Sequence, residues 1–200
     1  MALLFGGFFY SIVILLPNLR NNNLERKKIS KLAKSFKIQA LTDPLTGVHN
    51  RRYFNDALNI YLSEFGKVKA ELGLIIIDLD HFKQINDVHG HDAGDQVLIE
   101  VAQRLKAASR DYDVVARIGG EEFAIITPCI SKKDLLTLAD RFRQMIADLE
   151  INEENGMIRT TASIGVATTS ETSLDAKALT KAADKSLYAA KHAGRNQVAG

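Results

Sequence analysis

Blocks of apolar and polar residues along the chain predict strands that alternate with helices. Residues 74–77 are apolar at every position, which is typical of a central strand buried on both faces. Shorter apolar runs at 114–116 and 124–126 predict two further strands, and residues 159–167 alternate as another. The pattern therefore predicts a central β-sheet whose middle strand ends near residue 78.

Apolar residues at helical spacing predict the connections between these strands. The predicted helices span 51–65, 95–108, a segment from the N-cap Ser131 to about 149, and 174–192. Asn155 and Gly156 predict a hairpin turn, and Gly194 is expected to end the last helix. The order β-α-β-β-α-β-α indicates an α/β (α+β) fold, in which helices flank a mixed central sheet.

The N-terminal region differs in composition from this domain. Residues 1–19 contain no charged residue, so as a hydrophobic helix they could just cross a hydrocarbon core of ~30 Å. Basic residues from Arg20 onward would then keep the following domain in the cytoplasm. The alternatives are a buried or interfacial helix, or the last membrane helix of a longer protein. We therefore expect a transmembrane segment at 1–19, a basic helix at 20–40 and a catalytic domain at 41–200.

Charge and cysteine content limit the classes of function. The chain has 200 residues, of which 46% are hydrophobic, and this is enough for a substantial core. Its net charge of +2 conceals a local +6 between Arg20 and Lys37, so the rest of the chain carries −4. A mildly acidic body argues against a nucleic acid polymer as partner. The single Cys129 is expected to be a small core residue in a reducing compartment.

Two pairs of carboxylates flank the predicted central strand and hairpin. Gly119 and Gly120 join two predicted strands, which predicts a tight turn with positive φ angles. Glu121 and Glu122 follow this turn, and their side chains should alternate in direction. Alone, this pattern is typical of a solvated turn. Asp78 and Asp80 at the end of the central strand change the interpretation, because acids from adjacent strand ends can form a Mg²⁺ site.

Three runs in this order closely resemble the GGDEF family of diguanylate cyclases, in its GGEEF form. They are DPLTGVHNRR, IIDLDHFKQINDVHGHDAGD and RIGGEEF, and the resemblance extends from Asp43 to about Val198. It implies a fold similar to nucleotidyl cyclases and polymerase palms. It also implies condensation of two GTP molecules into cyclic di-GMP, with release of two pyrophosphates. Each subunit of a homodimer would hold one GTP, and a helix at 23–40 would help the subunits to pair.

The resemblance assigns catalytic roles to the carboxylates described above. Asp78 and Glu121, with the backbone carbonyl of Leu79, are expected to bind two Mg²⁺ ions per active site, with Mn²⁺ as an alternative. Glu122 is expected to assist either as an outer metal ligand or as a proton acceptor. These ions would activate the attacking hydroxyl and stabilise the leaving pyrophosphate.

The resemblance also implies a set of GTP-binding residues, for which the residues alone leave alternatives open. A carboxylate such as Asp95 can accept hydrogen bonds from the N1–H and amine of guanine, but it could instead be a helix N-cap. Asn86 could be a simple turn residue. Cations near the end of a helix are usually solvated, although here they match residues that reach the triphosphate. The implied set is Phe82, Lys83, Asn86, Asp95, Gly119, Gly120, Lys191 and Arg195.

A further pair, Arg110 and Asp113, stands at the offset from Gly119 where many GGDEF cyclases bind their product. By itself this pair is typical of a surface ion pair. With the resemblance, it implies inhibition by cyclic di-GMP. The resulting expectation is an enzyme of bacterial second-messenger signalling at the inner membrane, with its catalytic domain in the cytoplasm. Its rivals are a degenerate GGDEF receptor and a palm-type polymerase.

Overall fold

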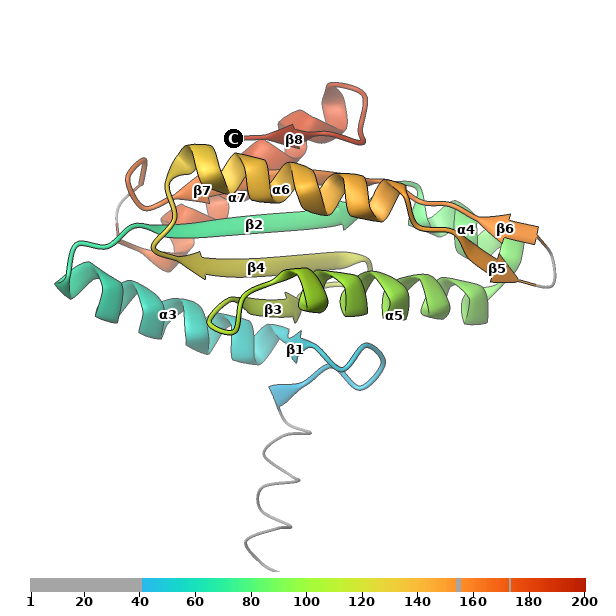
Figure 1. Cartoon of the computed structure of the whole chain (residues 1–200), viewed down its shortest axis with the longest axis horizontal. Coiled ribbons are helices and arrows are strands. Elements are labelled where there is room, and N and C mark those ends of the chain that lie inside the picture. The colour runs from blue at the N-terminus through green and yellow to red at the C-terminus, as the bar shows by residue number, and fades with distance from the viewer. Residues whose placement is uncertain (1–40, 154–155, 173) are drawn as a thin grey trace, which may run out of the picture. The chain divides into compact units, whose positions relative to one another are not determined.

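The structure, a computed structural model, describes residues 41–153, 156–172 and 174–200. Strand β2 (Leu72–Leu79) lies in the interior of a six-stranded sheet (Figure 1). The other strands of this sheet are β1 (His49–Asn50), β3 (Val114–Arg117), β4 (Glu122–Pro128), β7 (Ala162–Thr168) and β8 (Val198–Ala199). A separate hairpin consists of β5 (Ile151–Glu153) and β6 (Gly156–Ile158). The helices are α3 (Arg51–Lys67), α4 (Phe82–His89), α5 (His91–Ala108), α6 (Lys132–Ala147) and α7 (Ala176–His192).

The sheet is mixed, with β2 as its buried middle strand. Its spatial order is β1-β3-β4-β2-β7-β8, and all eight residues of β2 are buried. β2 pairs antiparallel with both β4 and β7, whereas β1 with β3 and β7 with β8 run parallel. The prediction of a strand that is apolar on both faces is therefore confirmed, because helices cover each face of the sheet.

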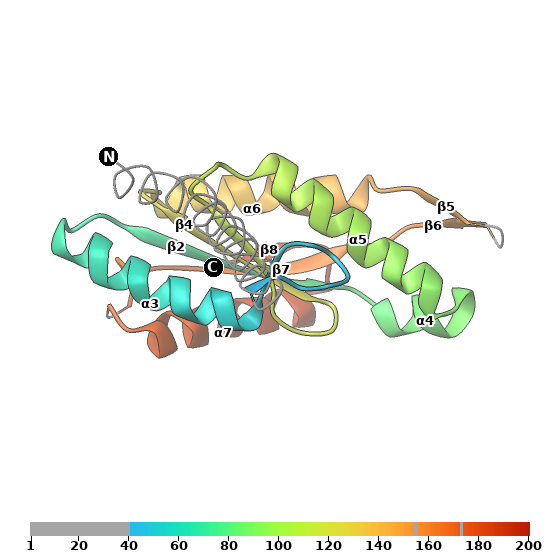
Figure 2. The same ribbon diagram turned by 90° about the horizontal axis from the view of Figure 1, so that it is seen from below.

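Two helical layers enclose the sheet, as Figure 2 shows: α3 and α7 lie on one side, and α5 and α6 on the other. Alternate residues of β2 supply the two cores. Leu74 and Ile76 belong to the cluster with the apolar residues of α3 and α7, and Ile75 and Ile77 to the cluster with those of α5 and α6. This arrangement confirms the predicted α/β (α+β) class.

Gly165 of β7 sets how closely α7 approaches the sheet. A Cβ at this position would collide with the carbonyl oxygen of Ala183 and with the backbone of Leu187. The absence of a side chain lets the helix backbone rest directly on the strand. The last turn of α7 is thereby held beside the sheet, near the residues that end β2.

Several element boundaries differ from the prediction. A turn was expected through Asn86, Asp87, Gly90 and Gly94, but these residues belong to α4 and the start of α5, with Gly90 between the helices at φ 89°. Only Phe82 and Ile85 of the eight residues in α4 are buried, so its apolar signal in the sequence is weak. The predicted strand 159–167 is instead β7 preceded by β6. The hairpin of β5 and β6 is present, whereas Asn155 of its turn lies outside the described residues.

Cys129 is exposed, so its predicted place in the core is wrong. It follows Pro128 at the end of β4 and has a φ of 54°. Its backbone N–H donates to the carbonyl of Glu71, 2.8 Å away. This hydrogen bond stabilises the turn in which the chain changes direction. The residue therefore belongs to a surface turn between β4 and α6.

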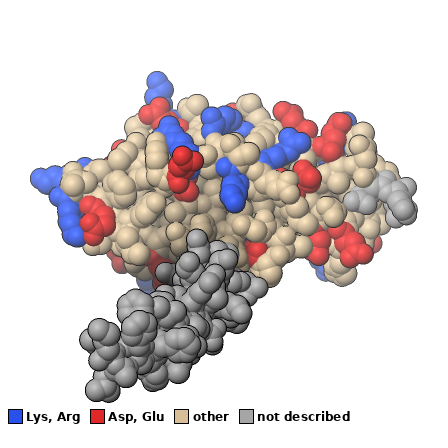
Figure 3. Space-filling model, turned by 60° about the horizontal axis from the view of Figure 1, so that its bottom comes forward, with Lys and Arg blue, Asp and Glu red and all other residues tan. Residues whose placement is uncertain are grey.

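The predicted membrane segment (1–19) and basic helix (20–40) lie outside the described residues. Within residues 41–200, as far as the structure describes them, no helix is long and apolar enough to cross a membrane. Figure 3 shows that basic and acidic side chains are interspersed over the visible face of the described domain. That face shows no broad basic surface, in keeping with the net charge of −4 outside Arg20 to Lys37.

Candidate active site

The end of β2 brings two carboxylates together across adjacent strands. Asp78 of β2 stands opposite Glu122 of β4 in the antiparallel register. Residues that face each other in such a pair project from the same face of the sheet. That face is the one covered by α3 and α7, because Asp78 continues the alternation of Leu74 and Ile76.

Lys191 in the last turn of α7 reaches Asp78. Its Nζ lies 2.7 Å from Asp78 Oδ2, and the exposed fractions of the two side chains are 34% and 11%. A carboxylate with so little exposure requires a charged or hydrogen-bonding partner. The structure thus joins a residue predicted to bind metal with one predicted to bind triphosphate, although 113 positions separate them in the sequence.

Glu122 forms a longer and more exposed ion pair than Asp78 does. Its carboxylate lies 3.9 Å from the guanidinium of Arg51, the first residue of α3, and the Arg51 side chain is 64% exposed. Arg51 also donates to the carbonyl of Ile118. Such an exposed ion pair contributes at most about 1 kcal/mol. Glu122 can therefore exchange this contact for another at little cost.

The Gly-Gly segment works differently from the predicted turn. Neither Gly119 nor Gly120 has a positive φ in the left-handed region, so the predicted tight two-residue turn is wrong. The N–H groups of Ile118 and Gly119 instead both donate to the carbonyl of Glu122. A Cβ on Gly119 would collide with the Glu122 carboxylate, whereas the Cβ position of Gly120 is open. The first glycine is needed because the carboxylate of Glu122 folds back over the backbone.

A salt bridge fixes this segment to the loop before α3. The guanidinium of Arg117 donates to the carbonyl of Gly120 at 2.9 and 2.8 Å, and also to Asp43 Oδ1 at 3.2 Å. Partial burial acts to raise the pKa of Asp43, but hydrogen bonds from Thr46 and Arg117 outweigh it and hold the pKa below its ordinary value. Asp43 therefore remains charged and keeps the Gly-Gly segment in place.

A pocket beside this segment gathers most of the residues predicted to bind GTP. Its volume is about 310 Å³, and α4, α5 and the connection between β3 and β4 line it. The lining residues are Phe82, Lys83, Asn86, His91, Asp95, Leu98, Arg117, Gly120 and Glu121. Glu121 thus contributes to this pocket, whereas Glu122 lies on the face of Asp78. Sequence reasoning did not single out His91.

The helices α4 and α5 position the two residues expected to read the base. Asn86 belongs to α4 and Asp95 to α5, whose N-cap is Gly90, so the alternatives of a turn residue and an N-cap are both wrong. Gly94, the neighbour of Asp95 in α5, faces Asn86. A Cβ on Gly94 would overlap Asn86 Oδ1, so the glycine allows the amide to lie against α5.

The turn between β2 and α4 leaves backbone N–H groups without a side-chain cap at the start of α4. His81 has φ 56° and occupies the N-cap position of α4 without a side-chain cap. Uncapped N–H groups at the start of a helix favour anions such as phosphate. The N–H of Leu79 donates to the carbonyl of Glu121 at 3.3 Å, which brings the backbone of one predicted metal-binding residue beside that of the other.

The donor set fits a divalent ion that is shared with a nucleotide. Among the described residues, no group of three or more His, Cys, Asp or Glu side chains is placed to hold a metal by itself. Mg²⁺ commonly takes one or two carboxylates and completes its coordination with water and substrate phosphates. Asp78 supplies one carboxylate, and the backbones of Leu79 and Glu121 meet at the same strand end, which is compatible with that requirement.

Arg195 is exposed in the turn after α7, with φ 63°. It forms no ion pair with the residues that the structure describes, in contrast to Lys191. The structure therefore places Arg195 in the turn that follows the helix of Lys191, without an ion pair to Asp78.

Arg110 and Asp113 lie away from this site, between α5 and β3. Asp113 accepts a hydrogen bond from the backbone N–H of Arg110 at 2.8 Å and another from Thr127 Oγ1 at 2.5 Å. Both residues line a pocket of about 420 Å³ that also includes Arg141 of α6. Sequence reasoning missed Arg141, because only the packing of α6 brings it near this pair.

The fold and the site define a palm-like α/β domain of the nucleotidyl cyclase type. Residues 40–197 match the family described as "Diguanylate cyclase, GGDEF domain", and the chain belongs to this family. The response regulator PleD of Caulobacter vibrioides is 41% identical over 163 residues, and diguanylate cyclase A of Treponema denticola is 38% identical over 160. These matches cover 80% and 78% of this chain, but the chain spans only 36% and 43% of the two relatives.

Solved structures agree with the fold. The coiled coil and GGDEF domain of DgcB from Caulobacter crescentus, in complex with c-di-GMP, has a TM-score of 0.85 at 29% identity. That match covers 92% of this chain and 98% of the other. The GGDEF domain of YfiN from Pseudomonas aeruginosa has a TM-score of 0.74 at 36% identity, covering 78% of this chain and 91% of the other.

Proposed function

We propose that this chain is a diguanylate cyclase, which condenses two GTP molecules into cyclic di-GMP and two pyrophosphates. One observation carries the proposal: Asp78, which stands opposite Glu122 across two strands, contacts Lys191, and the neighbouring Glu121 lines a pocket with Asn86 and Asp95. A base site and a site for metal and phosphate are thus adjacent on one domain. The relatives named diguanylate cyclase support the same reaction.

Within this proposal, Asp95 and Asn86 select guanine. The Asp95 carboxylate accepts from the guanine N1–H and amine, a donor pair that adenine lacks. A site built for that pair disfavours adenine because its buried polar groups would be left unpaired. Lys83, Lys191 and Arg195 supply positive charge for the triphosphate, while Phe82 is a buried residue next to Lys83 at the start of α4.

Asp78 and Glu121, with the Leu79 carbonyl, would hold Mg²⁺. When bound, the metal would polarise the α-phosphate and offset the charge of the leaving pyrophosphate. Glu122 lies on the Asp78 side of the sheet, where it would assist either as an outer metal ligand or by accepting the proton of the attacking 3′-hydroxyl. Gly119 and Gly120 keep side chains away from the approaching phosphates.

Two subunits are required because each holds a single GTP, whose 3′-hydroxyl attacks the α-phosphate of the other. The chain would pair through residues 23–40, and residues 1–19 would anchor it to the inner membrane with the domain in the cytoplasm. Product bound at Arg110 and Asp113 would hold the domains apart and inhibit the enzyme.

Incubation of the purified chain with GTP and Mg²⁺, followed by mass spectrometry of the products, tests the proposal. Cyclic di-GMP and pyrophosphate in a ratio of one to two are the expected products. Binding of GTP without turnover would instead identify a receptor, and pppGpG alone would mean that the second condensation fails.

A further inference from the structure

Asp80 is a buried carboxylate to which the proposed reaction gives no role. It follows β2 directly, two residues beyond Asp78, and it is 5% exposed. None of the ion pairs among residues 41–153, 156–172 and 174–200 includes it. A carboxylate buried without a cation needs several hydrogen-bond donors, and such groups are retained where they hold a particular geometry.

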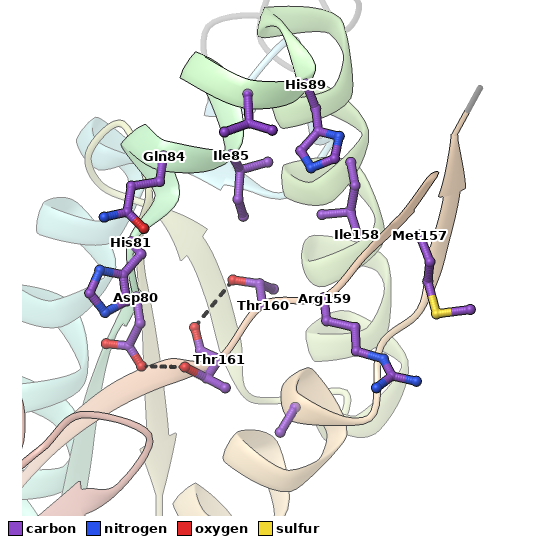
Figure 4. Close-up of a pocket in the computed structure, with 12 residues that line it drawn as sticks. Asp80, His81, Gln84, Ile85, His89, Met157, Ile158, Arg159, Thr160 and Thr161 are labelled. Atoms are coloured by element: carbon purple, nitrogen blue, oxygen red, sulfur yellow. Dashed lines mark hydrogen bonds between the residues drawn. The ribbon is translucent and has the colours of Figure 1, made fainter. Parts of the chain in front are cut away.

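Both oxygens of Asp80 are occupied by neutral donors from the far end of the chain. Oδ1 accepts from Ser163 Oγ at 2.7 Å, and Oδ2 accepts from Thr161 Oγ1 at 2.7 Å and from the backbone N–H of Asn196 at 3.0 Å. Figure 4 shows the Asp80 carboxylate directed toward Thr161 at the edge of a pocket beside α4. The N–H of Asp80 also donates to the Thr161 carbonyl at 2.8 Å.

The turn at residues 194–196, to which Asp80 is hydrogen-bonded, has an unfavourable backbone conformation. Gly194, Arg195 and Asn196 have φ angles of 118°, 63° and 44°, and the last two are not glycines. L-residues rarely adopt the left-handed region unless neighbouring contacts fix them. Here the N–H of Arg195 donates to Ala190, and the side chain of Asn196 accepts from Arg143 at 3.0 Å. The bond to Asp80 is the contact that ties this turn to the end of β2.

We propose that Asp80 is a positioning residue, which sets the placement of Arg195 relative to Asp78. This inference rests on the proposed function, because it concerns residues expected to meet the GTP triphosphate. Asp80 follows the strand that carries Asp78, and its carboxylate accepts a hydrogen bond from Asn196 in the turn that carries Arg195. The carboxylate therefore fixes two halves of one binding site that are far apart in sequence.

Two further contacts to Asp80 come from Ser163 of β7 and from Thr161, the residue just before that strand. Ser163 of β7 stands opposite Asp78 in the β2–β7 register, and its hydroxyl is fully buried against Asp80. Two hydroxyl donors orient the carboxylate so that Oδ2 faces the N–H of Asn196. This explains why a buried serine occupies the second position of β7.

A double-mutant cycle on the full chain tests the inference. Affinity for a non-hydrolysable GTP analogue with Mg²⁺ is measured for the unmutated chain, Asp80→Asn, Asp80→Ala, Arg195→Ala and the corresponding double variants. Loss of charged hydrogen bonds to the turn should lower affinity about tenfold in Asp80→Ala, with a smaller loss in Asp80→Asn. In the Arg195→Ala background the same changes should cost less than about twofold, because the residue that Asp80 positions is already absent.

Controls separate positioning from general stability. Asp175→Asn makes the same substitution at the other end of α7, where the carboxylate caps the helix, and should leave analogue affinity unchanged. Binding of cyclic di-GMP, expected at Arg110 and Asp113, should be equal in Asp80→Asn and the unmutated chain. If Asp80→Ala does not fold, Asp80→Asn carries the test because it keeps the shape and one acceptor oxygen.

An equal loss of affinity in both backgrounds would overturn the inference, as would unchanged affinity in Asp80→Asn and Asp80→Ala. Equal losses for the analogue and for cyclic di-GMP would reduce Asp80 to a residue needed only for folding. The readout does not require turnover. Binding without cyclic di-GMP synthesis would therefore overturn the proposed function alone, while absence of analogue binding to the unmutated chain would overturn both.

Discussion

The ammonium of Lys191 forms an ion pair of 2.7 Å with the carboxylate of Asp78, at the end of the central strand. The same carboxylate is expected to bind a divalent ion, and the same ammonium is expected to bind the triphosphate. Neither interaction can form fully while the pair is intact. Binding of the metal and binding of the nucleotide should therefore favour each other, because each separates the pair that competes with the other.

Replacement of Lys191 by methionine should make Asp78 available to metal in the absence of nucleotide. We expect Lys191→Met to raise the affinity for Mn²⁺ roughly two- to fivefold, the range that loss of a partly exposed ion pair allows. Affinity for GTP should fall in the same variant. Mn²⁺ binding followed by electron paramagnetic resonance measures the first effect.

Lys185→Met provides the control, because it removes the same charge from an exposed position on the same helix. It should leave Mn²⁺ affinity within error of the unmutated chain. An equal rise in both variants would show a general effect of charge, and a fall in Lys191→Met would contradict competition at Asp78.

The expected metal-binding carboxylates should be essential for turnover but dispensable for the fold. Asp78→Ala and Glu121→Ala should lower the rate of synthesis by more than about 100-fold, because each removes a ligand from the site that stabilises transferring charge. Circular dichroism should show an unchanged secondary structure, since both residues lie at strand ends outside the two apolar cores. Asp111→Ala, at an exposed position, is the matched control. Substantial turnover in Asp78→Ala or Glu121→Ala would show that the replaced residue is not a required metal ligand.

Gly94 offers a test of the base pocket that separates binding from stability. An alanine in the middle of a helix normally stabilises it by up to about 1 kcal/mol relative to glycine. In Gly94→Ala, however, the new methyl group would displace the amide of Asn86. We expect unchanged or higher thermal stability together with an affinity for GTP lowered about tenfold, the effect of losing one hydrogen bond to the base.

Gly66→Ala is the control for this substitution. Its methyl group would meet only the end of the exposed Leu174 side chain, which can move aside. GTP affinity should be unchanged in this variant. Equal GTP affinities for Gly94→Ala and the unmutated chain would show that Asn86 does not read the base.

Product inhibition should depend on Arg110. Its guanidinium can bind a phosphate or the edge of a guanine, and the pocket that it lines with Asp113 and Arg141 is separate from the end of β2. Arg110→Ala should therefore keep the initial rate and raise the final yield of cyclic di-GMP, and inhibition of the unmutated chain should not be relieved by GTP. Progress curves with added cyclic di-GMP measure both effects. Identical inhibition of the unmutated chain and Arg110→Ala would show that Arg110 does not bind the product.

Much of the fold was predictable because burial leaves a direct pattern in the sequence. The apolar run at 74–77 correctly predicted a strand covered on both faces, and Ser131 correctly predicted the N-cap of α6. α4 escaped prediction because only two of its residues reach the core, so the turn-like composition of 82–94 dominated. Cys129 was misplaced because hydrophobicity alone does not reveal that a chain reverses at that residue.

The sequence suggested a set of candidate site residues but not how they lie together. The sequence suggested Asp78 and Lys191 separately, and only the packing of α7 on β7 joins them. The glycine pair was interpreted through positive φ angles, whereas Gly119 is needed because Glu122 folds over it. His91, Gly94 and Arg141 carry no signal of their own, since their places depend on which helices face each other.

The most direct test of the central claim is the product formed from GTP over a range of protein concentrations. The unmutated chain with GTP and Mg²⁺ should release cyclic di-GMP, with a rate per subunit that rises with concentration until dimers are complete. ATP should give little product, and Asp78→Ala none. Absence of cyclic di-GMP from a folded chain that binds GTP, or a rate per subunit that is constant through the measured range of dimerisation, would contradict the account.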